Sequence, residues 1–314
     1  MLTEIGGYFG FEDLGHKEYY PGLLALNTAR NALCYIIKAY KIKKIYIPYY
    51  LCNCIEDTLL KNNMPFEKYH LEKDFEPIIT KKLGKNEWIL LVNYYGQLSP
   101  QRVEALKNKY INVVLDNTHA FFQSPIKGIP TLYSCRKFFG VADGAYLATE
   151  KILNEEFETD VSKDRMKHII GRYEVNASEY YSDYQKIEAD IAIEPIKLMS
   201  KLTRNILGAI DYIKVIEKRN SNFNFLHEKL KGLNKLKLYI PNGPFAYPYY
   251  LDNAVYIRRK LAEKKIYIPT LWPNVLYDEG ANEQDKIYAQ NILPIPCDQR
   301  YDIPSIKIIL REMG

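Results

Sequence analysis

Residues 88–117 read WILLVNYYGQLSPQRVEALKNKYINVVLDN, and this stretch decides the class of fold. Its first part, WILLVN at 88–93, is nearly all apolar, as expected of a strand that is covered on both faces. A predicted helix over 100–109 separates it from a second short apolar strand, NVVL at 112–115. Strands that alternate with helices in this way are typical of a mostly parallel sheet, so the sequence predicts an α/β fold.

The same alternation extends outward from this stretch, over about residues 26–150. Apolar residues at helical spacing predict a helix over 30–40, and the apolar run IYIP at 45–48 predicts a strand that ends at proline. The other elements predicted here are a helix over 51–62 and strands near 65–69, 131–134 and 144–149. Together they predict a mostly parallel central sheet with flanking helices.

The pattern changes after residue 150. Residues 150–232 are rich in helix signals, and 199–230 predict one or two long amphipathic helices. The elements predicted farther on are strands near 235–240 and 266–269, helices over 252–264 and 304–312, and a proline- and tyrosine-rich turn, GPFAYPYY, at 243–250. We therefore expect a large α/β domain over 1–232, which includes the helical connector, and a small C-terminal α+β domain over 233–314.

The composition is that of a globular protein, since 47% of the 314 residues are hydrophobic and 26% are charged. There is no run of 18 apolar residues and no secretory signal pattern at the start, so we expect a cytoplasmic protein without membrane spans. The net charge of +5 is mild, and basic residues alternate with acidic ones, which argues against nucleic acid as a partner. Cys52 and Cys54 form a CxC, but no second pair lies at zinc-site spacing, so we expect no metal site.

Asp116 and Lys137 each follow a predicted strand of the sheet. Asp116 comes directly after VVL, and Lys137 follows TLYS about twenty residues later. Ligands of open parallel sheets bind beyond the carboxyl ends of the strands, so we expect both side chains to lie in one crevice. An amine and a carboxylate that converge there suit a pyridine-type aldehyde cofactor. The lysine would form a Schiff base, and the aspartate would keep the pyridine nitrogen protonated.

Two further segments are compatible with such a cofactor. NTARNAL begins a predicted helix in which Thr28 is suited to the N-cap, and the free amides of Ala29 and Arg30 would offer a phosphate site. Tyr49 and Tyr50 follow the strand IYIP, where an aromatic ring could stack on a planar cofactor.

Each segment also has an ordinary structural interpretation. A lone aspartate at a strand end is more often a turn or cap residue, and a lone lysine is usually an exposed surface charge. Thr28 alone is explained by helix capping, and a single tyrosine carries little weight in a chain that has 28 of them. The occurrence of all four segments in one chain is what favours the cofactor.

Together and in this order, the segments resemble the DegT/DnrJ/StrS family of sugar aminotransferases, which are pyridoxal 5′-phosphate (PLP) enzymes of fold type I. The resemblance covers nearly the whole chain, and residues 199–219 are similar to the helices that help to build the dimer in the family. The matching motifs are TARNAL for the family's SGTxAL, NYYGQ (93–97) for HLYGQ, LDNTHAFF (115–122) for EDAAQA, SCRKFFGVADGAYLAT (134–149) for SFxxxKxLGxxGDGGxxxT, and LPIPCDQRYD (293–302) for LPxxPxL.

The resemblance implies a role for each matching residue. Lys137 would hold the cofactor and later move the proton between substrate carbon and cofactor carbon. Asp116 would pair with the pyridinium nitrogen, and His119 matches the glutamine or histidine on the side of the cofactor's 3′-oxygen. A hydrogen-bonded histidine at the sheet edge is an equally open interpretation of His119.

The remaining implied roles concern the phosphate and the ring. Ala29 and Arg30 match the glycine and threonine whose amides hold the phosphate, and Tyr133 or Ser134 would stand in for the family's phosphate-binding serine. A residue of the stretch PYYLC would take the ring-stacking position, and the candidates are Tyr49, Tyr50 and Cys52.

The chain departs from the family pattern at three places. Arg30 replaces the usual threonine, and its guanidinium could bind the phosphate bidentately or point away. Ser134 precedes Lys137 by three residues rather than five, and one residue is lost before Asp143 and Gly144. The region after residue 150, which shapes the substrate pocket in the family, is also shorter.

The resemblance implies a homodimeric, PLP-dependent aminotransferase of surface-polysaccharide or amino-sugar biosynthesis. Its donor would be an amino acid such as glutamate, and its acceptor a nucleotide-linked keto sugar. Lys137 favours transamination over the dehydration catalysed by relatives with histidine at that position. A third interpretation is a protein that keeps the fold but binds a ligand or partner without turnover, which the altered phosphate loop and the shortened region would suit.

Overall fold

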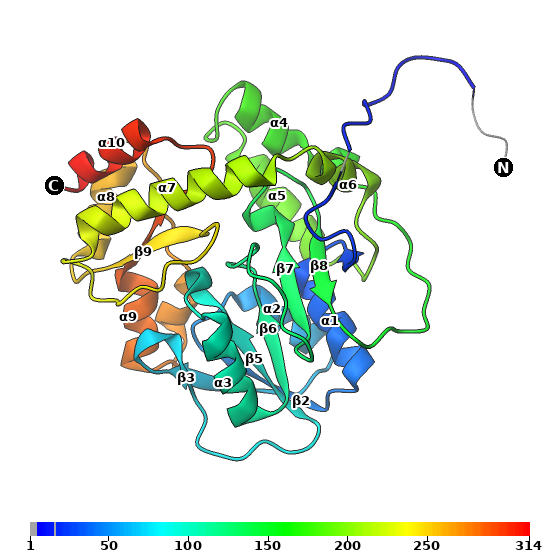
Figure 1. The fold of residues 1–314 in the computed structure, drawn as a ribbon, viewed down its shortest axis with the longest axis horizontal. Coiled ribbons are helices and arrows are strands. Elements are labelled where there is room, and N and C mark those ends of the chain that lie inside the picture. Colours follow the sequence, from blue (N-terminus) through cyan, green and yellow to red (C-terminus); the bar gives the residue numbers. More distant parts are fainter. Residues whose placement is uncertain (1–4, 16) are drawn as a thin grey trace.

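The computed structural model describes residues 5–15 and 17–314. Its main feature is an eight-stranded sheet with the strand order β1-β8-β7-β6-β5-β2-β3-β4 (Figure 1). The strands of this sheet are β1 (Leu24–Leu26), β2 (Lys44–Pro48), β3 (Phe66–Leu71), β4 (Pro77–Ile78), β5 (Glu87–Val92), β6 (Val113–Asp116), β7 (Thr131–Ser134) and β8 (Ala145–Ala148).

The middle of the sheet is parallel. The pairs β3–β2, β2–β5, β5–β6 and β6–β7 all run in the same direction. Antiparallel pairs lie at the two ends, with β8 and β1 beyond β7 on one side and β4 beyond β3 on the other. The predicted α/β class with a mostly parallel sheet is therefore confirmed.

Ten α-helices connect and cover the strands of the described chain. They are α1 (Ala29–Tyr40), α2 (Asn53–Lys61), α3 (Pro100–Tyr110), α4 (Lys167–Glu174), α5 (Tyr181–Ala192), α6 (Lys201–Gly208), α7 (Tyr212–Leu230), α8 (Ala254–Glu263), α9 (Glu283–Asn291) and α10 (Ile303–Met313). Among the described residues, none of these helices combines the length and the apolar character needed to cross a bilayer. Figure 1 shows α7, α8 and α10 grouped at one end of the molecule.

Buried apolar side chains form a main core around the parallel strands and a second one under α7. Ile45 and Leu90 belong to the main core, and neither is accessible to solvent. Phe223 of α7 and Ile295 are equally buried in the second core. Burial of each such side chain contributes about 2 kcal/mol, which explains why the central strands are nearly all apolar.

The C-terminal part of the chain contains a two-stranded antiparallel sheet, β9 (Ala246–Tyr250) with β10 (Ile292–Pro296). The strands predicted near 235–240 and 266–269 were wrong, because neither segment forms a ladder. The stretch 243–250, predicted as a turn, instead contains β9. Prolines at 248 and 294 face each other in this short ribbon, where both strands have a free edge and tolerate a missing donor.

The backbone of residues 235–240 forms hydrogen bonds with a side chain instead of with a neighbouring strand. Gln97 accepts a hydrogen bond from the Tyr239 amide (2.9 Å) and donates one to the Tyr239 carbonyl (3.1 Å). One side chain thus replaces a neighbouring strand, which apolar patterning does not reveal. Val275 and Ala289 are buried in the main core, so the residues after 233 also pack on the large sheet, and the boundary at 232 stays a prediction.

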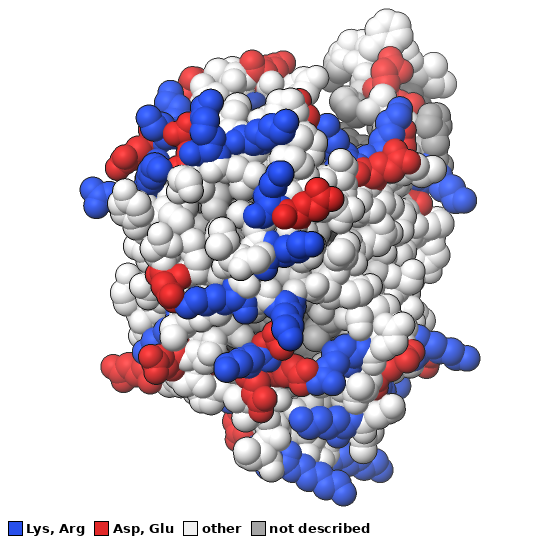
Figure 2. Space-filling view, turned by 60° about the vertical axis from the view of Figure 1, so that its left-hand side comes forward, with Lys and Arg blue, Asp and Glu red and all other residues white. Residues whose placement is uncertain are grey.

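Charges of both signs are spread over the surface. On the face in Figure 2, Lys and Arg side chains lie among Asp and Glu side chains, with uncharged areas between them. Lys68 is a partly buried case of such pairing, with contacts to both Glu56 (2.6 Å) and Asp278 (2.7 Å). Opposite charges are thus interspersed on this face rather than gathered by sign.

Gly243 lies in a tight turn against the ring of Phe122. Its φ is +58°, and a Cβ at this position would come within 2.2 Å of Phe122 Cδ2. We expect Gly243→Ala to lower the free energy of unfolding by about 3 kcal/mol, from backbone strain of about 1 kcal/mol and overpacking. Gly128→Ala is the matched control, because Gly128 also has a positive φ (+77°) but no neighbour within 4 Å. Urea titrations that give equal losses for both variants would contradict this assignment.

Candidate active site

Asp116 is the last residue of β6, and its side chain is buried at the carboxyl edge of the sheet. Its Oδ1 accepts a hydrogen bond from the amide of Thr118 (2.8 Å). Burial raises the pKa of the carboxyl, while the bonds from Thr118 and the positive charge of Lys137 act in the opposite direction. A buried carboxylate with so few partners attracts a cationic group.

Lys137 ends a 3-10 turn, Cys135–Lys137, that follows β7 directly, and its side chain is exposed. Since β6 and β7 are parallel neighbours with Asp116 opposite Leu132, both strands end at the same edge. The charge of Lys137 contributes to the pKa values of Asp116 and of His119. The structure therefore brings these three predicted residues into one electrostatic environment.

His119 lies three residues beyond β6 between aromatic rings. Its imidazole stacks on Phe245 with a centroid distance of 4.0 Å and is parallel to Trp272 at 5.7 Å. Burial, helped by the charge of Lys137, lowers the pKa of His119 to about 3. The ring is therefore neutral, and its buried Nδ1 has no hydrogen-bond partner among the described residues.

The titration of His119 makes stability depend on pH. The pKa of His119 is about 3 in the folded protein, against an ordinary value of 6.5. Between these values the unfolded chain binds a proton that the folded chain does not, so the free energy of unfolding falls as the pH decreases, by at most about 1.4 kcal/mol per pH unit. In urea titrations at pH 7, 6 and 5, His119→Gln should lose less stability than the parent protein. Parallel losses would show that His119 is not the group responsible.

The start of α1 offers the backbone amides expected of a phosphate site. Thr28 caps the helix by accepting a hydrogen bond from the Asn31 amide at its Oγ1 (3.1 Å). The first intrahelical bond runs from Ala32 to Thr28, so the amides of Ala29 and Arg30 precede the helical ladder. Capping is thus observed for Thr28, and a phosphate role for the two amides remains a prediction.

Tyr133 and Ser134 lie on opposite faces of β7, because successive strand residues alternate. The ring of Tyr133 packs on Tyr20 with a centroid distance of 4.8 Å, and its hydroxyl donates to the Gln123 carbonyl (2.8 Å). Leu132, on the same face as Ser134, belongs to the main core, which also contains the buried side of α1. Of the two candidates, Ser134 is the one on the side of α1.

The three ring-stacking candidates occupy different surroundings. Tyr49 stacks on His70 with a centroid distance of 4.6 Å, and Tyr50 is fully buried with its hydroxyl 3.1 Å from that of Tyr95. Cys52 precedes α2, and a hydrogen bond from Cys54, together with the charges of Lys137 and Arg30, lowers the pKa of its thiol. Cys52 therefore lies in the surroundings of Lys137, whereas both tyrosines are engaged elsewhere.

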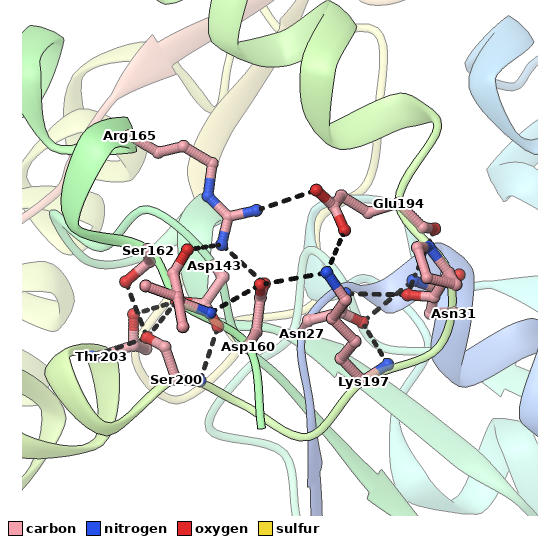
Figure 3. A network of polar contacts seen from close by, with 12 residues as sticks. Asn27, Asn31, Asp143, Asp160, Ser162, Arg165, Glu194, Lys197, Ser200 and Thr203 are labelled. Carbon is pink, nitrogen blue, oxygen red and sulfur yellow. Dashed lines mark hydrogen bonds and ion pairs between the residues drawn. The ribbon is translucent and has the colours of Figure 1, made fainter. Parts of the chain in front are cut away.

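A buried polar network, shown in Figure 3, fixes the turn after Lys137 and was not predicted. Asp143 accepts hydrogen bonds from the amide (2.8 Å) and hydroxyl (2.7 Å) of Ser200 and from the hydroxyl of Thr203. The adjacent Gly144, with φ +115°, donates its amide to the Asn27 carbonyl (2.6 Å). These bonds connect β1 and α6 to the turn through partners that are far away in sequence.

A second group of contacts, with Asn31, Glu194 and Lys197 labelled in Figure 3, connects residues 194–197 to the start of α1. Asn31 donates through Nδ2 to the carbonyl of Pro195 (2.7 Å) and to the side chain of Asn27 (2.9 Å). Lys197 pairs with Glu194 at 2.6 Å. The segment around Pro195 therefore packs against the start of α1.

Two aromatic residues from the C-terminal part also reach the site. Phe245 and Trp272 flank His119, and Trp272 meets Tyr50 edge-on with a centroid distance of 4.8 Å. Trp272 has φ +69°, which is unusual for a bulky residue, and it precedes Pro273, which restricts it further. No sequence signal identified these rings among the many aromatic residues.

Neither a family model nor a curated protein matches the sequence. The fold, by contrast, is similar to many solved structures. One is the sugar aminotransferase CalS13 from Micromonospora echinospora, at 12% identity, with 93% of this chain and 86% of that chain covered and a TM-score of 0.64. Another is the putative sugar aminotransferase Spr1654 from Streptococcus pneumoniae, at 15% identity, 93% and 85% coverage and a TM-score of 0.63.

A DegT/DnrJ/EryC1/StrS aminotransferase from Brucella abortus is similar at 12% identity, covering 94% of this chain and 86% of that chain with a TM-score of 0.62. The chain therefore has the fold of the DegT/DnrJ/StrS sugar aminotransferases over nearly its whole length, as the motifs indicated. At this identity the similarity establishes the fold, and the chemistry has to be argued from the site.

Proposed function

We propose that this chain is a PLP-dependent aminotransferase that transfers an amino group from an amino acid to a sugar. The observation that carries the proposal is the shared environment of Lys137, Asp116 and His119 at the carboxyl ends of neighbouring parallel strands. Ligands of open parallel sheets bind at this edge. An amine, a buried carboxylate and a neutral imidazole that meet there suit the opposite ends of an aromatic aldehyde.

The residues present fit PLP. Asp116 is buried and Thr118 supplies its hydrogen bonds among the described residues, so a protonated pyridine nitrogen would add a direct cationic partner. The ring nitrogen Nδ1 of His119 has no hydrogen-bond partner among the described residues, and the amides of Ala29 and Arg30 would receive the phosphate at the positive end of α1. When bound, the cofactor supplies the electron sink that stabilises negative charge at the substrate carbon.

Lys137 has the two properties that its proposed role requires. Its side chain is exposed, so its Nζ can reach a cofactor carbonyl and later be released to hold and move a proton. The 3-10 turn on which it lies is closed by the Cys135 carbonyl, which accepts from the amides of Phe138 (3.0 Å) and Phe139 (2.9 Å), and the Cys135 amide donates to the Gly144 carbonyl (3.0 Å). The amine is thus carried by a flexible four-carbon side chain on a turn that hydrogen bonds close.

Similar structures support the choice of substrate. Spr1654 has been solved in PLP and PMP forms, DesV from S. venezuelae with a ketimine intermediate, and DesI in the presence of its TDP-sugar product. For this chain we accordingly propose glutamate as donor and a nucleotide-linked keto sugar as acceptor, in surface-polysaccharide or amino-sugar biosynthesis. The proposal also includes a cytoplasmic homodimer without nucleic-acid or membrane partners.

A second candidate function is binding of PLP or a similar ligand without turnover. It is favoured by Arg30 at the phosphate position and by the segment around Pro195 that covers the start of α1. Glutamate distinguishes the two functions. A transaminase converts the bound cofactor to its amine form when glutamate is added, whereas a binding protein leaves the spectrum unchanged.

Replacing Lys137 tests the proposed function directly. The purified protein incubated with PLP should gain the visible absorbance band of the lysine-bound cofactor, and Lys137→Ala should lose both the band and any borohydride-stable label, because its covalent anchor is gone. Lys127→Ala is the matched control, since Lys127 is also exposed but lies outside the proposed site. A parent protein that stays colourless with PLP, or a label that persists in Lys137→Ala, would refute the proposal.

A further inference from the structure

Arg219 on α7 is a buried arginine that reaches three other segments of the chain. Its side chain is 1% exposed. Its Nη1 donates to the carbonyl of Pro244 (2.7 Å), its Nη2 to the carbonyl of Phe138 (3.2 Å), and its Nε to Oε1 of Gln299 (2.7 Å). One guanidinium therefore joins α7, the turn after β7, the start of β9 and the segment after β10.

This arginine has no acidic partner within ion-pair distance in the described part of the chain. The nearby Asp298 pairs instead with Arg300, at 2.7 and 2.9 Å. Burial lowers the pKa of Arg219 to about 10, which reflects the cost of placing a guanidinium in a dry environment. The buried guanidinium of Arg219 donates to two backbone carbonyls, and we infer that it fixes the position of these two backbone segments.

The segment that it holds carries Lys137. Phe138 follows Lys137 directly, and its carbonyl accepts hydrogen bonds from both Arg219 and Nε2 of Gln299 (2.7 Å). The guanidinium also lies over the Phe138 ring, 4.4 Å from its centroid. The residue next to Lys137 is thus fixed by two side chains that come from α7 and from the C-terminal segment.

The same guanidinium is connected to His119. The Pro244 carbonyl that accepts from Arg219 precedes Phe245, whose ring stacks on the imidazole of His119 at 4.0 Å. Arg219 therefore contacts the neighbours of two proposed cofactor residues at once. A change in its position would move Phe138 and Phe245 relative to each other.

We propose that Arg219 and Gln299 are positioning residues, which set the orientation of Lys137 relative to His119 through the carbonyls of Phe138 and Pro244. The inference rests on the proposed function, because it concerns how the lysine is presented to PLP. Neither residue touches the reacting atoms. Their effect is on the geometry of the lysine turn, which must be held closely for an amine to attack a bound carbonyl.

Gln299→Ala is the decisive variant, because Gln299 is half-buried and its loss leaves Arg219 in place. Asn222→Ala is the matched control. Asn222 lies one helical turn from Arg219 and donates to the carbonyls of Cys297 (3.3 Å), Asp298 (3.3 Å) and Tyr301 (2.9 Å), so it holds the same C-terminal segment without reaching Phe138. Arg219→Lys keeps the charge but loses the fork of donors that serves three acceptors.

The rate of covalent PLP attachment, followed by absorbance and by borohydride trapping at Lys137, should fall about tenfold in Gln299→Ala, which corresponds to about 1.4 kcal/mol. In Asn222→Ala it should stay at the parental rate, even though thermal unfolding shows an equal or larger loss of stability. Equal attachment rates in the two variants would overturn the inference. Arg219→Lys should resemble Gln299→Ala, and parental attachment in that variant would also count against it.

A second measurement, which needs no PLP, tests the positioning of Lys137 independently of the proposed function. Acetic anhydride labels exposed lysines of the protein without PLP, and the rate at Lys137 can be referred to that at Lys127 in the same sample. Gln299→Ala should change this ratio, while Asn222→Ala should not. If the parent protein fails to take up PLP, the proposed function is lost. The labelling ratio then still decides whether Arg219 and Gln299 position the lysine.

Discussion

The short parallel ladder between β6 and β7 is the constraint on which the candidate site depends. Its paired residues are Leu115 with Thr131 and Asp116 with Leu132, and the amide of Asn117 extends it by donating to the Leu132 carbonyl (2.9 Å). Parallel pairing makes both strands end at the same edge, so Asp116 and the turn of Lys137 emerge side by side. A slip of one residue would turn Asp116 to the other face of the sheet.

Burial then gives the residues at this edge different electrostatic properties. It raises the pKa of Asp116 and lowers that of His119, so both groups resist ionisation, while the amine of Lys137 stays in contact with solvent. Groups whose neutral forms are favoured by burial, beside an exposed amine, are typical of functional sites.

The sequence was informative wherever the relevant neighbours are set by strand order. Asp116 and Lys137 meet because parallel strands share an edge, and Thr28 caps α1 because the cap is a local interaction. Prediction from the sequence failed where tertiary packing determines which residue a side chain contacts. Tyr49 and Tyr50 follow β2 as predicted, yet one packs on His70 and the other on Tyr95, and no local pattern distinguishes these outcomes from stacking on a ligand.

Long-range hydrogen bonds were invisible for the same reason. Gln97 replaces a strand for residues 235–240, and Arg219 reaches Phe138 across 81 positions of the chain, so neither partnership leaves a periodic signal. Asp143 entered the sequence analysis only as part of the motif around Lys137, but its hydrogen bonds to Ser200 and Thr203 connect segments about 60 residues apart. The reason why a polar side chain is buried is clear only when its hydrogen-bond partners are known.

The bonds that join Phe138 to Arg219 and Gln299 have a consequence for biosynthesis. They span 81 and 161 positions, so Gln299 has to leave the ribosome before the lysine turn can take its final shape. Contacts of such separation form late in folding, after loop closure has been achieved. A nascent chain that ends before Gln299 would thus expose Lys137 on a turn that lacks both hydrogen bonds, and the turn would reach its final geometry only after Gln299 has been synthesised.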